Sequence, residues 1–295
     1  MSLWKTLRFI TTHPINSGQK SRGLARFFRW QIVSRLSGGE IIHPWVGGAK
    51  LAVRHGDHGL TGNIYCGLHE LSEMALVLTV LRPGDIFADV GANYGSYTVL
   101  AAAVSGARCY SFEPHPASYQ RLLRNIQINS IEQRVNAFNI AVGAECGTLP
   151  FSGGSTPTSH MLATVESPIG AIEVPVKTLD GVMSSESPFM AKIDVEGYES
   201  QVLQGAERIL GDPSLRVIIV ELNGSGARYG FDEGSIRQKV HDYGFRPYGY
   251  EPMHRRLIPR TAGPGGDNTI YVRDLPTVAD RIAKAPIVEV LGVNI

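Results

Sequence analysis

The sequence has little of what marks several protein classes. Its three cysteines, Cys66, Cys109 and Cys146, are widely spaced and form no CxxC pair, which argues against a disulfide framework and a zinc knuckle. Few, unpaired cysteines are typical of a reducing compartment, so we expect a cytoplasmic protein. Apolar stretches fall far short of the roughly 20 residues that span a bilayer. Arg8 and Pro14 interrupt the first of them, so we expect no export signal.

Net charge is also scarce, because 28 Lys+Arg and 27 Asp+Glu leave +1 over 295 residues. The balance is uneven along the chain: residues 1–39 hold seven Lys or Arg and no acidic residue, whereas the remaining 21 basic and 27 acidic residues give −6. An acidic body without a basic stripe argues against a nucleic-acid partner. Residues 1–39 also hold interleaved aromatics, which predicts peripheral contact with the anionic inner membrane face. The alternative is packing on the acidic body or on a second subunit of a homo-oligomer.

The residues that are present describe an ordinary folded α/β chain. Hydrophobic residues make up 43% and charged residues 19%, which is typical of a globular protein. A helical repeat of apolar residues over 68–81 ends at Pro83 and Gly84. Beyond it, apolar runs alternate with helical patterns. Strands are predicted at 86–90, 109–112, 135–142, 190–195 and 217–222, and helices from the turn at 91–95 through 105, at 117–129, 199–210 and 233–243.

This alternation predicts a doubly wound, mostly parallel sheet with helices on both faces, in a Rossmann-like α/β fold. Three later segments, 245–250, 256–258 and 269–272, are expected to be antiparallel strands. Between 143 and 179 the helical period disappears and Gly and Pro are frequent, which indicates an inserted hairpin and loop.

Ligands of an open parallel sheet lie at the carboxyl ends of its strands. The first predicted strand ends in DVGANYG at 89–95, whose glycines allow a sharp turn and a close approach to a ligand. The second ends at Glu113, 22 residues after Gly91. A carboxylate there can accept both ribose hydroxyls and would repel a 2′-phosphate. Together the two motifs predict a nucleoside ligand.

The glycine spacing of the loop indicates which nucleoside. A dinucleotide site uses Gly-x-Gly-x-x-Gly so that a helix N-terminus receives a pyrophosphate, whereas this loop has Gly-x-x-x-Gly. Asn93 stands inside it, and Asp89, before the first glycine, could hold a cationic amino group. These features favour a nucleoside that carries an amino acid. A nicotinamide-dependent oxidoreductase is the alternative, although it lacks the middle glycine.

Three segments together resemble the FkbM family of S-adenosylmethionine-dependent methyltransferases. They are FADVGANYGSYT at 87–98, FEP at 112–114 and KIDVEGYE at 192–199. The resemblance extends over about residues 50–273. It implies a class I methyltransferase fold, S-adenosyl-L-methionine as cofactor, and O-methylation of a hydroxyl on a saccharide or glycosylated acceptor, or on a polyketide or other secondary metabolite.

The resemblance also implies roles for residues and a division of the chain. Glu113 would hold the ribose, Asn139 and Ala141 would flank the adenine, and Glu70 is a further cofactor candidate. We divide the chain into a basic N-terminal extension with small strands at 1–66, a methyltransferase domain at 67–275, and a C-terminal tail at 276–295. The residues that would surround the methionine part are Gly91, Asn93, Gly95, Tyr97 and Thr98.

The reaction needs an aligned acceptor oxygen and a group that takes its proton. Asp194 and Glu196 end the fourth strand, and their two-residue spacing places them on one side of the sheet, so we predict that one of them is the general base. Alternatively, Asp194 orients the cofactor's amino group and Glu196 orders the turn at Gly197. Glu221 and Asn223, after the fifth strand, are candidates for orienting the acceptor.

Histidines offer an alternative general base, and histidines or carboxylates could bind a metal. His160, in the insertion, is a second candidate for the base in an acceptor pocket. The histidines of 54–58 lack further ligands at a suitable spacing, so we interpret that run as a surface loop. Carboxylates such as Asp194 and Glu196 suit Mg²⁺, but nothing in the sequence requires it, and we predict no metal.

Overall fold

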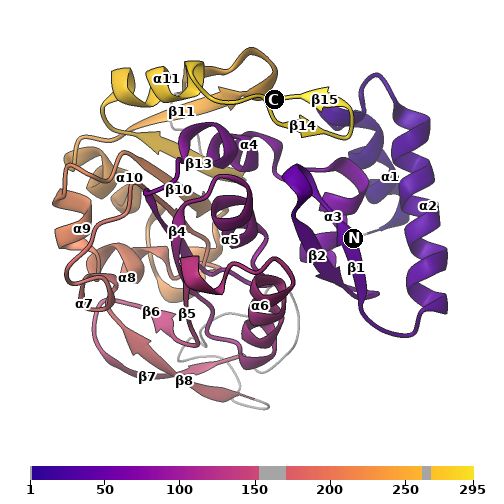
Figure 1. The fold of residues 1–295 in the computed structure, drawn as a ribbon. Helices are drawn as coiled ribbons and strands as arrows, with labels where there is room; N and C mark the ends of the chain where they lie inside the picture. The colour runs from indigo at the N-terminus through magenta and orange to yellow at the C-terminus, as the bar shows by residue number, and fades with distance from the viewer. Residues whose placement is uncertain (1, 153–170, 261–266) are drawn as a thin grey trace.

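The computed structural model describes residues 2–152, 171–260 and 267–295 (Figure 1). Its centre is an eight-stranded mixed sheet in the order β12-β11-β13-β10-β9-β3-β4-β5. The five parallel strands are β3 (Ile86–Val90), β4 (Arg108–Phe112), β5 (Val135–Phe138), β9 (Met190–Ile193) and β10 (Val217–Leu222). The antiparallel strands at one edge are β11 (Arg246–Glu251), β12 (Arg256–Pro259) and β13 (Asp267–Val272). The predicted fold class, with its late antiparallel strands, is confirmed.

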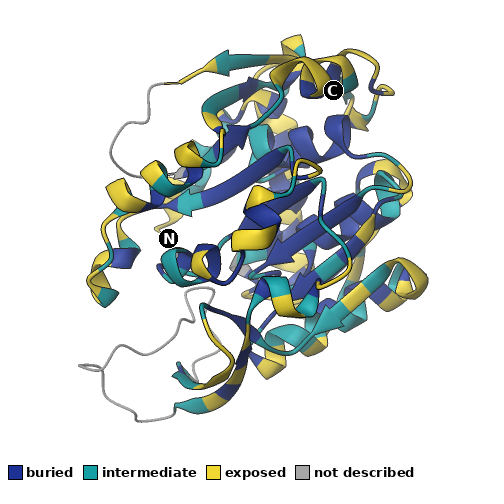
Figure 2. Cartoon of the chain, turned by 90° about the vertical axis from the view of Figure 1, so that its left-hand side faces the viewer, coloured by how far each residue is buried: buried dark blue, intermediate teal, exposed yellow. Residues whose placement is uncertain are grey.

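Helices cover both faces of this sheet (Figures 1 and 2). One face carries α4 (Leu71–Val80), α5 (Ser96–Val99) with a π-helical turn over Leu100–Val104, α6 (Pro116–Ile128) and α11 (Leu275–Ala283). The other carries α7 (Leu179–Val182), α8 (Glu199–Gln204), α9 (Glu207–Gly211) and α10 (Glu233–Asp242). Because both faces are covered, all five residues of β3 are buried, and the strand is a continuous apolar run interrupted only by Asp89.

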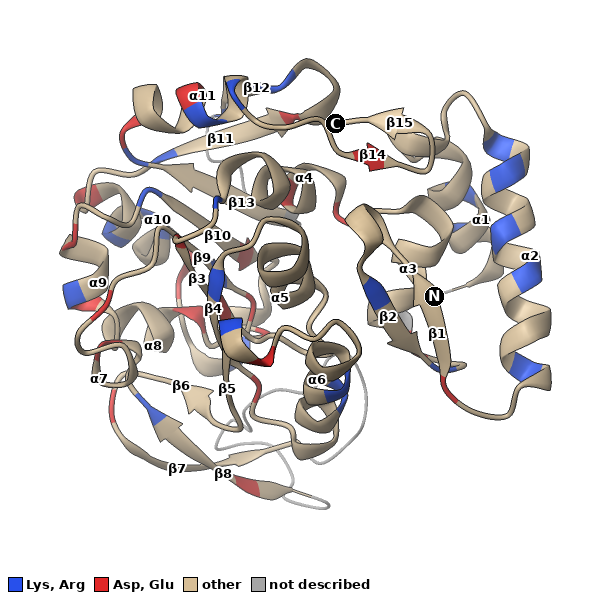
Figure 3. Ribbon diagram, viewed as in Figure 1, with Lys and Arg blue, Asp and Glu red and all other residues tan. Residues whose placement is uncertain are grey.

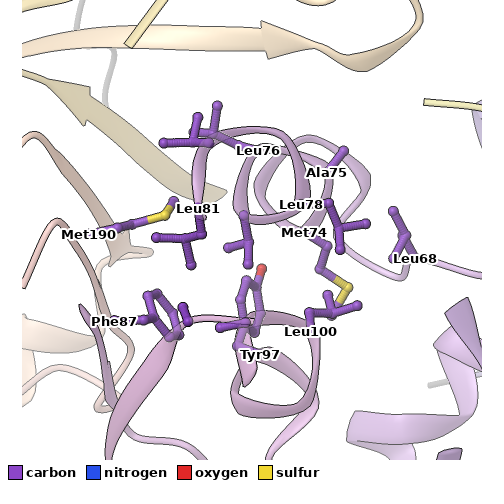
Figure 4. Packing of buried hydrophobic residues seen from close by; sticks show 14 of the residues in the cluster. Leu68, Met74, Ala75, Leu76, Leu78, Leu81, Phe87, Tyr97, Leu100 and Met190 are labelled. Carbon is purple, nitrogen blue, oxygen red and sulfur yellow. The ribbon is translucent and has the colours of Figure 1, made fainter. Parts of the chain in front are cut away.

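The core on the first face is built around α4. Figure 4 shows Leu78 and Leu81 lying close to Phe87 of β3 and to Tyr97 of α5, all of them buried. Removing this much apolar surface from water, at about 25 cal/mol per Å², is the main source of stability for such a layer. The packing fixes α4 and α5 beside the end of β3, where the glycine-containing loop begins.

The strand expected over 190–195 ends at Ile193, and the helical repeat over 68–81 is a helix only over Leu71–Val80. Two further predicted elements are wrong in their extent for a reason that the structure shows. The strand expected over 135–142 ends at Phe138, because the Asn139 side chain turns back to donate to the Glu113 and Pro114 carbonyls at 2.8 and 2.9 Å. The helix expected over 199–210 breaks at Gly205, where a Cβ would lie 2.0 Å from the Gly143 carbonyl oxygen. Both interruptions come from contacts with distant residues.

The insertion, together with β6 just before it, forms a small second sheet in the order β6-β8-β7. Its strands are β6 (Ala141–Val142), β7 (Gly147–Phe151) and β8 (Ile172–Lys177), and β7 and β8 pair antiparallel as the predicted hairpin.

The N-terminal residues fold as a separate layer (Figure 1). It consists of α1 (Leu3–Thr12), α2 (Lys20–Leu36), the hairpin of β1 (Ile41–Pro44) and β2 (Lys50–Val53), and α3 (His58–Cys66). Arg121 of α6 pairs with Asp57 at 2.5 Å and fixes this layer to the sheet domain. At the other terminus, α11 is followed by a hairpin of β14 (Glu289–Val290) and β15 (Val293–Asn294). Within the described ranges no helix is both long and apolar enough to cross a membrane.

Candidate active site

A cavity of about 520 Å³ opens at the carboxyl ends of β3, β4, β9 and β10, where an open parallel sheet binds its ligand. It brings together ten of the residues singled out from the sequence. They are Glu70, Asp89, Gly91, Asn93, Tyr97, Glu113, Ala141, Asp194, Glu196 and Glu221.

Four other candidates do not line this cavity, within the part of the chain that the structure describes, and a fifth, His160, lies outside the described residues. Gly95, at the start of α5, lies against Leu122. The Asn139 side chain donates a hydrogen bond to the Glu113 carbonyl oxygen, just after β4. Asn223 is exposed and accepts a hydrogen bond from the Ser225 N–H at 2.9 Å, which orders its own turn. The remaining one, Thr98, acts on a wall residue, as described below.

The loop after β3 requires glycine at its first position. Gly91 has φ +85°, and a Cβ there would lie 1.8 Å from the carbonyl oxygen of Asp194. Any side chain would therefore push the β3 loop away from the β9 loop. Asn93 also has positive φ, at +49°, which asparagine adopts more readily than most residues.

Glu113, which directly follows β4, is hydrogen-bonded to the loop after β3. Its Oε2 accepts from the Asn93 N–H at 2.8 Å and its Oε1 from the His115 N–H at 2.9 Å. Burial raises the pKa of Glu113 to about 7 despite these two bonds. A carboxylate offers about four acceptor sites, so two remain for hydroxyl groups such as those of a ribose.

Asp89 is a wall residue of the cavity. It accepts a hydrogen bond from the Thr98 hydroxyl at 2.6 Å, and that hydroxyl also lies 2.7 Å from the Ser111 Oγ. Burial raises the pKa of Asp89, while the charge of Lys192 opposes the rise. Thr98 thus positions a wall residue without lining the cavity.

Glu70 joins three distant segments. Its Oε2 accepts from the Tyr97 hydroxyl at 2.6 Å and its Oε1 from the Asn268 amide at 3.1 Å. Burial, with the nearby charge of Glu70, raises the pKa of Tyr97 well above its ordinary value. The phenol therefore stays protonated and donates its hydrogen bond to Glu70. Glu70 is thus held at the cavity wall by Tyr97 and Asn268.

Lys192 was not predicted as a site residue, and it is the cavity's basic side chain. Its Nζ lies 2.5 Å from Asp194 Oδ2 and 4.7 Å from the centre of the Tyr97 ring. Burial alone would lower the pKa of Lys192, but Asp194, Glu70 and Asp89 together raise it above its ordinary value. Its place two residues before Asp194 in a strand was the available signal, because such residues share a face.

Three carboxylates meet opposite this ammonium. One oxygen from each of Asp194, Glu196 and Glu221 lies within 4.8 Å of the others. Burial, then the charges of Asp194 and Glu196, raise the pKa of Glu221 to about 9. Burial would raise the pKa of Asp194 too, but Lys192 outweighs it and the pKa falls below its ordinary value. Such a trio could hold a divalent cation, although Lys192 already neutralises part of its charge.

The turn after β9 is ordered by another glutamate. Glu199 Oε1 accepts from the Val195 and Gly197 N–H groups at 3.2 and 3.1 Å. Burial raises the pKa of Glu199 to about 7. Glu199 thus makes a turn-ordering contact at Gly197, and Glu196, for which the sequence suggested such a role, lines the cavity.

The charge of the described lining is strongly one-sided. Six carboxyl groups and one ammonium face a single cavity, and the pKa values of Glu113 and Glu221 are raised because their ionised forms are desolvated and crowded. A bound cation relieves such crowding, whereas a pyrophosphate adds to it. The lining therefore fits a sulfonium nucleoside with an amino-acid tail.

A doubly wound sheet with this cavity at its strand ends defines a Rossmann-like, class I methyltransferase fold. The model of the methyltransferase FkbM domain matches residues 89–247, just over half of the chain. The chain belongs to the FkbM methyltransferase family.

Known proteins that resemble the chain are distant and covered only in part. It is 27% identical over 161 residues to the hexuronic acid methyltransferase AglP of Haloferax volcanii, covering 52% of this chain and 62% of that protein. It is 29% identical over 177 residues to the 31-O-demethyl-FK506 methyltransferase FkbM of Streptomyces tacrolimicus, with coverages of 48% and 67%. A solved FkbM methyltransferase from Methylobacillus flagellatus matches with a TM-score of 0.46 and 16% identity, over 72% of this chain and 52% of that one.

Proposed function

We propose that the chain is an S-adenosylmethionine-dependent methyltransferase that methylates a hydroxyl of a saccharide or glycosylated acceptor. The observation that carries this proposal is the cavity with six carboxyls and one ammonium at the strand ends of an FkbM domain. Membership of the family supports the reaction. The hexuronic acid methyltransferase among its relatives supports the acceptor class.

The chain's own residues account for cofactor binding. Glu113 has acceptor sites left for two ribose hydroxyls, and Asp89 offers a buried carboxyl group beside the loop, whose ionised form an ammonium would stabilise. Ala141 lies on the cavity wall beyond β4, where an adenine would pack. The cofactor, when bound, supplies a methyl group already activated by its sulfonium. The protein must then align an acceptor oxygen in line with that bond.

The acceptor hydroxyl loses its proton as its oxygen takes the methyl group. Asp194 is available to accept it, because Lys192 keeps Asp194 ionised, and the same ion pair makes Asp194 a weak base, so that alignment of the acceptor must supply most of the rate. With its pKa near 9, Glu221 is neutral at pH 7 and can donate a hydrogen bond. These roles follow the pattern in which neighbouring carboxyls have pKa values pushed apart.

An aromatic cluster beside the cavity favours a ring-shaped acceptor. Tyr198 lines the cavity, and its ring meets Tyr229 edge-to-face at 5.4 Å, while Tyr229 stacks on Phe231 at 5.7 Å. Tyrosine presents an apolar face and a polar tip, which matches a sugar ring with its C–H faces and hydroxyl edges. A polyketide or other secondary metabolite is the second candidate, favoured by the 29% identity to the FK506-pathway enzyme.

Calorimetric titration with S-adenosylhomocysteine and, separately, with NAD⁺ tests the cofactor. We expect binding of the first and none of the second; the reverse result would overturn the proposal and favour an oxidoreductase. Transfer of a labelled methyl group to glycosides or to polyketides then distinguishes the acceptor classes. Tyr198→Leu should raise the KM for the acceptor and leave the affinity for S-adenosylhomocysteine unchanged, while Tyr198→Phe, which keeps the ring and loses the hydroxyl, should raise the KM less.

A further inference from the structure

Helix α2 has two apolar faces, of which the protein itself covers one. The covered face packs on Tyr65 and its neighbours and consists of Gly23, Phe27, Trp30 and Ser34. On the opposite side, Phe28, Ile32 and Leu36 recur every four residues and form one stripe at 3.6 residues per turn. They are 54%, 61% and 82% exposed. An amphipathic helix that only packed on its own domain would be polar along this side.

Arginines flank the exposed stripe on both sides. At helical spacing, Arg22 and Arg29 lie along one edge of it and Arg35 along the other, and all three are exposed. Figure 3 shows Lys and Arg as blue bands along α2 at the outer edge of the molecule. An apolar stripe between rows of basic residues is the pattern of a helix that lies in a membrane interface.

Helix α1, which packs against α2, also exposes apolar residues next to basic ones. Trp4 is 82% exposed and Leu3 60%, and the exposed Lys5 and Arg8 lie beside them. Tryptophan is enriched at membrane–water interfaces because its ring is amphipathic. Six of the eleven large hydrophobic residues that are exposed in the described chain belong to these two helices. They are Leu3, Trp4, Phe28, Ile32, Val33 and Leu36.

We propose that this face of α1 and α2 docks on an anionic lipid bilayer. The stripe would enter the boundary between headgroups and acyl chains, and the flanking arginines would contact lipid phosphates. Charge decides against a second copy as the occupant: residues 1–39 contain no acidic residue. A two-fold contact through this face would therefore set arginines against arginines. The proposal is independent of the acceptor and of the methyl-transfer reaction.

Co-sedimentation of the full chain with phosphatidylcholine vesicles, with and without phosphatidylglycerol, tests it. We expect binding only to the anionic vesicles, reversed at about 1 M salt, where the screening length falls to about 3 Å. Arg22→Gln with Arg29→Gln should weaken binding about 30-fold, from about 1 kcal/mol per charge near the surface. Phe28→Ser with Ile32→Ser should also release the protein.

The control is a matched pair of exposed residues outside the docking face, Lys284→Gln with Ile287→Ser, which should bind like wild type. Thermal unfolding should be unchanged in the arginine variant and in the control, whose residues are exposed, and slightly lowered in Phe28→Ser with Ile32→Ser, because the Phe28 ring meets Phe27 edge-to-face at 5.2 Å. Failure of the wild type to bind anionic vesicles at low salt overturns the proposal. So does a concentration-dependent dimer in analytical ultracentrifugation that Ile32→Asp dissolves, since a second copy would then occupy the face.

Discussion

Lys192 Nζ lies 2.5 Å from Asp194 Oδ2 inside the cavity. Lys192 belongs to β9, and Asp194 directly follows the last residue of that strand. The lysine side chain is 4% exposed and the aspartate 24%. This contact gives the site a fixed ion pair before any ligand enters. It keeps one of the three clustered carboxyls ionised while a second, Glu221, holds its proton.

Removing the ammonium should destabilise the fold. In Lys192→Met the carboxylates of Asp194, Glu70 and Asp89 lose their shared counter-charge, and breaking one partner of a buried pair costs about 3–5 kcal/mol. Because the folded pKa of Lys192 is raised, this stabilisation is complete at pH 7 and is lost only in strongly alkaline solution. Urea unfolding at pH 7 measures it. The control is Lys239→Met, which removes a surface ion pair to Glu207 and should leave the free energy of unfolding nearly unchanged. Equal effects of the two variants would contradict burial of the Lys192 charge.

Gly91→Ala should abolish cofactor binding through a steric clash. Its Cβ would lie 1.8 Å from the Asp194 carbonyl oxygen, so the β3 and β9 loops must separate. Gly84 is the matched control, since its φ of +94° resembles the +85° of Gly91 and no atom lies within 4 Å of an added Cβ. Gly84→Ala should cost only the left-handed strain of about 1–2 kcal/mol and bind S-adenosylhomocysteine normally by calorimetry. Normal binding by Gly91→Ala would show that the loops do not shape the site.

The strands and the site's location were predictable because both follow from local patterns. Continuous apolar runs gave β3 and β10 their observed bounds, and the residues at strand ends pointed to Glu113 and Asp194. Other features depend on contacts that no local pattern encodes. Glu70 is held by Asn268, 198 residues away.

The role of Lys192 shows the same limit. Its spacing from Asp194 could be read from the strand, but the carboxylates of Glu70 and Asp89 that also raise the pKa of Lys192 come from other elements of the chain. The strand expected through 142 ended early for a related reason, because Asn139 bonds to carbonyls that precede it by 26 and 25 residues.

The buried Glu113 should make the ligand-free protein less stable as pH rises. Its folded pKa is about 7 against an ordinary 4.5, so the folded state holds a proton that the unfolded state has lost. Stability should therefore fall between about pH 4.5 and 7 and then level off, with a contribution from Glu113 on the order of 3 kcal/mol. In Glu113→Gln the difference in unfolding free energy between pH 5 and pH 7.5 should narrow by about 2 kcal/mol, which is the part of that contribution expressed within this pH range. Part of the remaining pH dependence comes from Glu199. The control is Glu289→Gln, at an exposed glutamate, which should show the same change of unfolding free energy with pH as the wild type. If this pH dependence were also unchanged in Glu113→Gln, the raised pKa of Glu113 would be refuted.

The two carboxyls with separated pKa values should respond differently to amide substitution. Glutamine resembles a protonated glutamate, so Glu221→Gln should keep methyl transfer at pH 7 within a few-fold of wild type, because Glu221 with a pKa of about 9 is already neutral there. Above about pH 9 the methyl-transfer activities of the wild type and of Glu221→Gln should differ, since only the wild type gains a second negative charge beside Asp194. Asp194→Asn removes the ionised carboxylate and should lower kcat by about 10²–10⁴-fold at every pH, the range for loss of a general base. Loss of activity in Glu221→Gln at pH 7, with S-adenosylhomocysteine binding intact, would instead assign the proton-accepting role to Glu221.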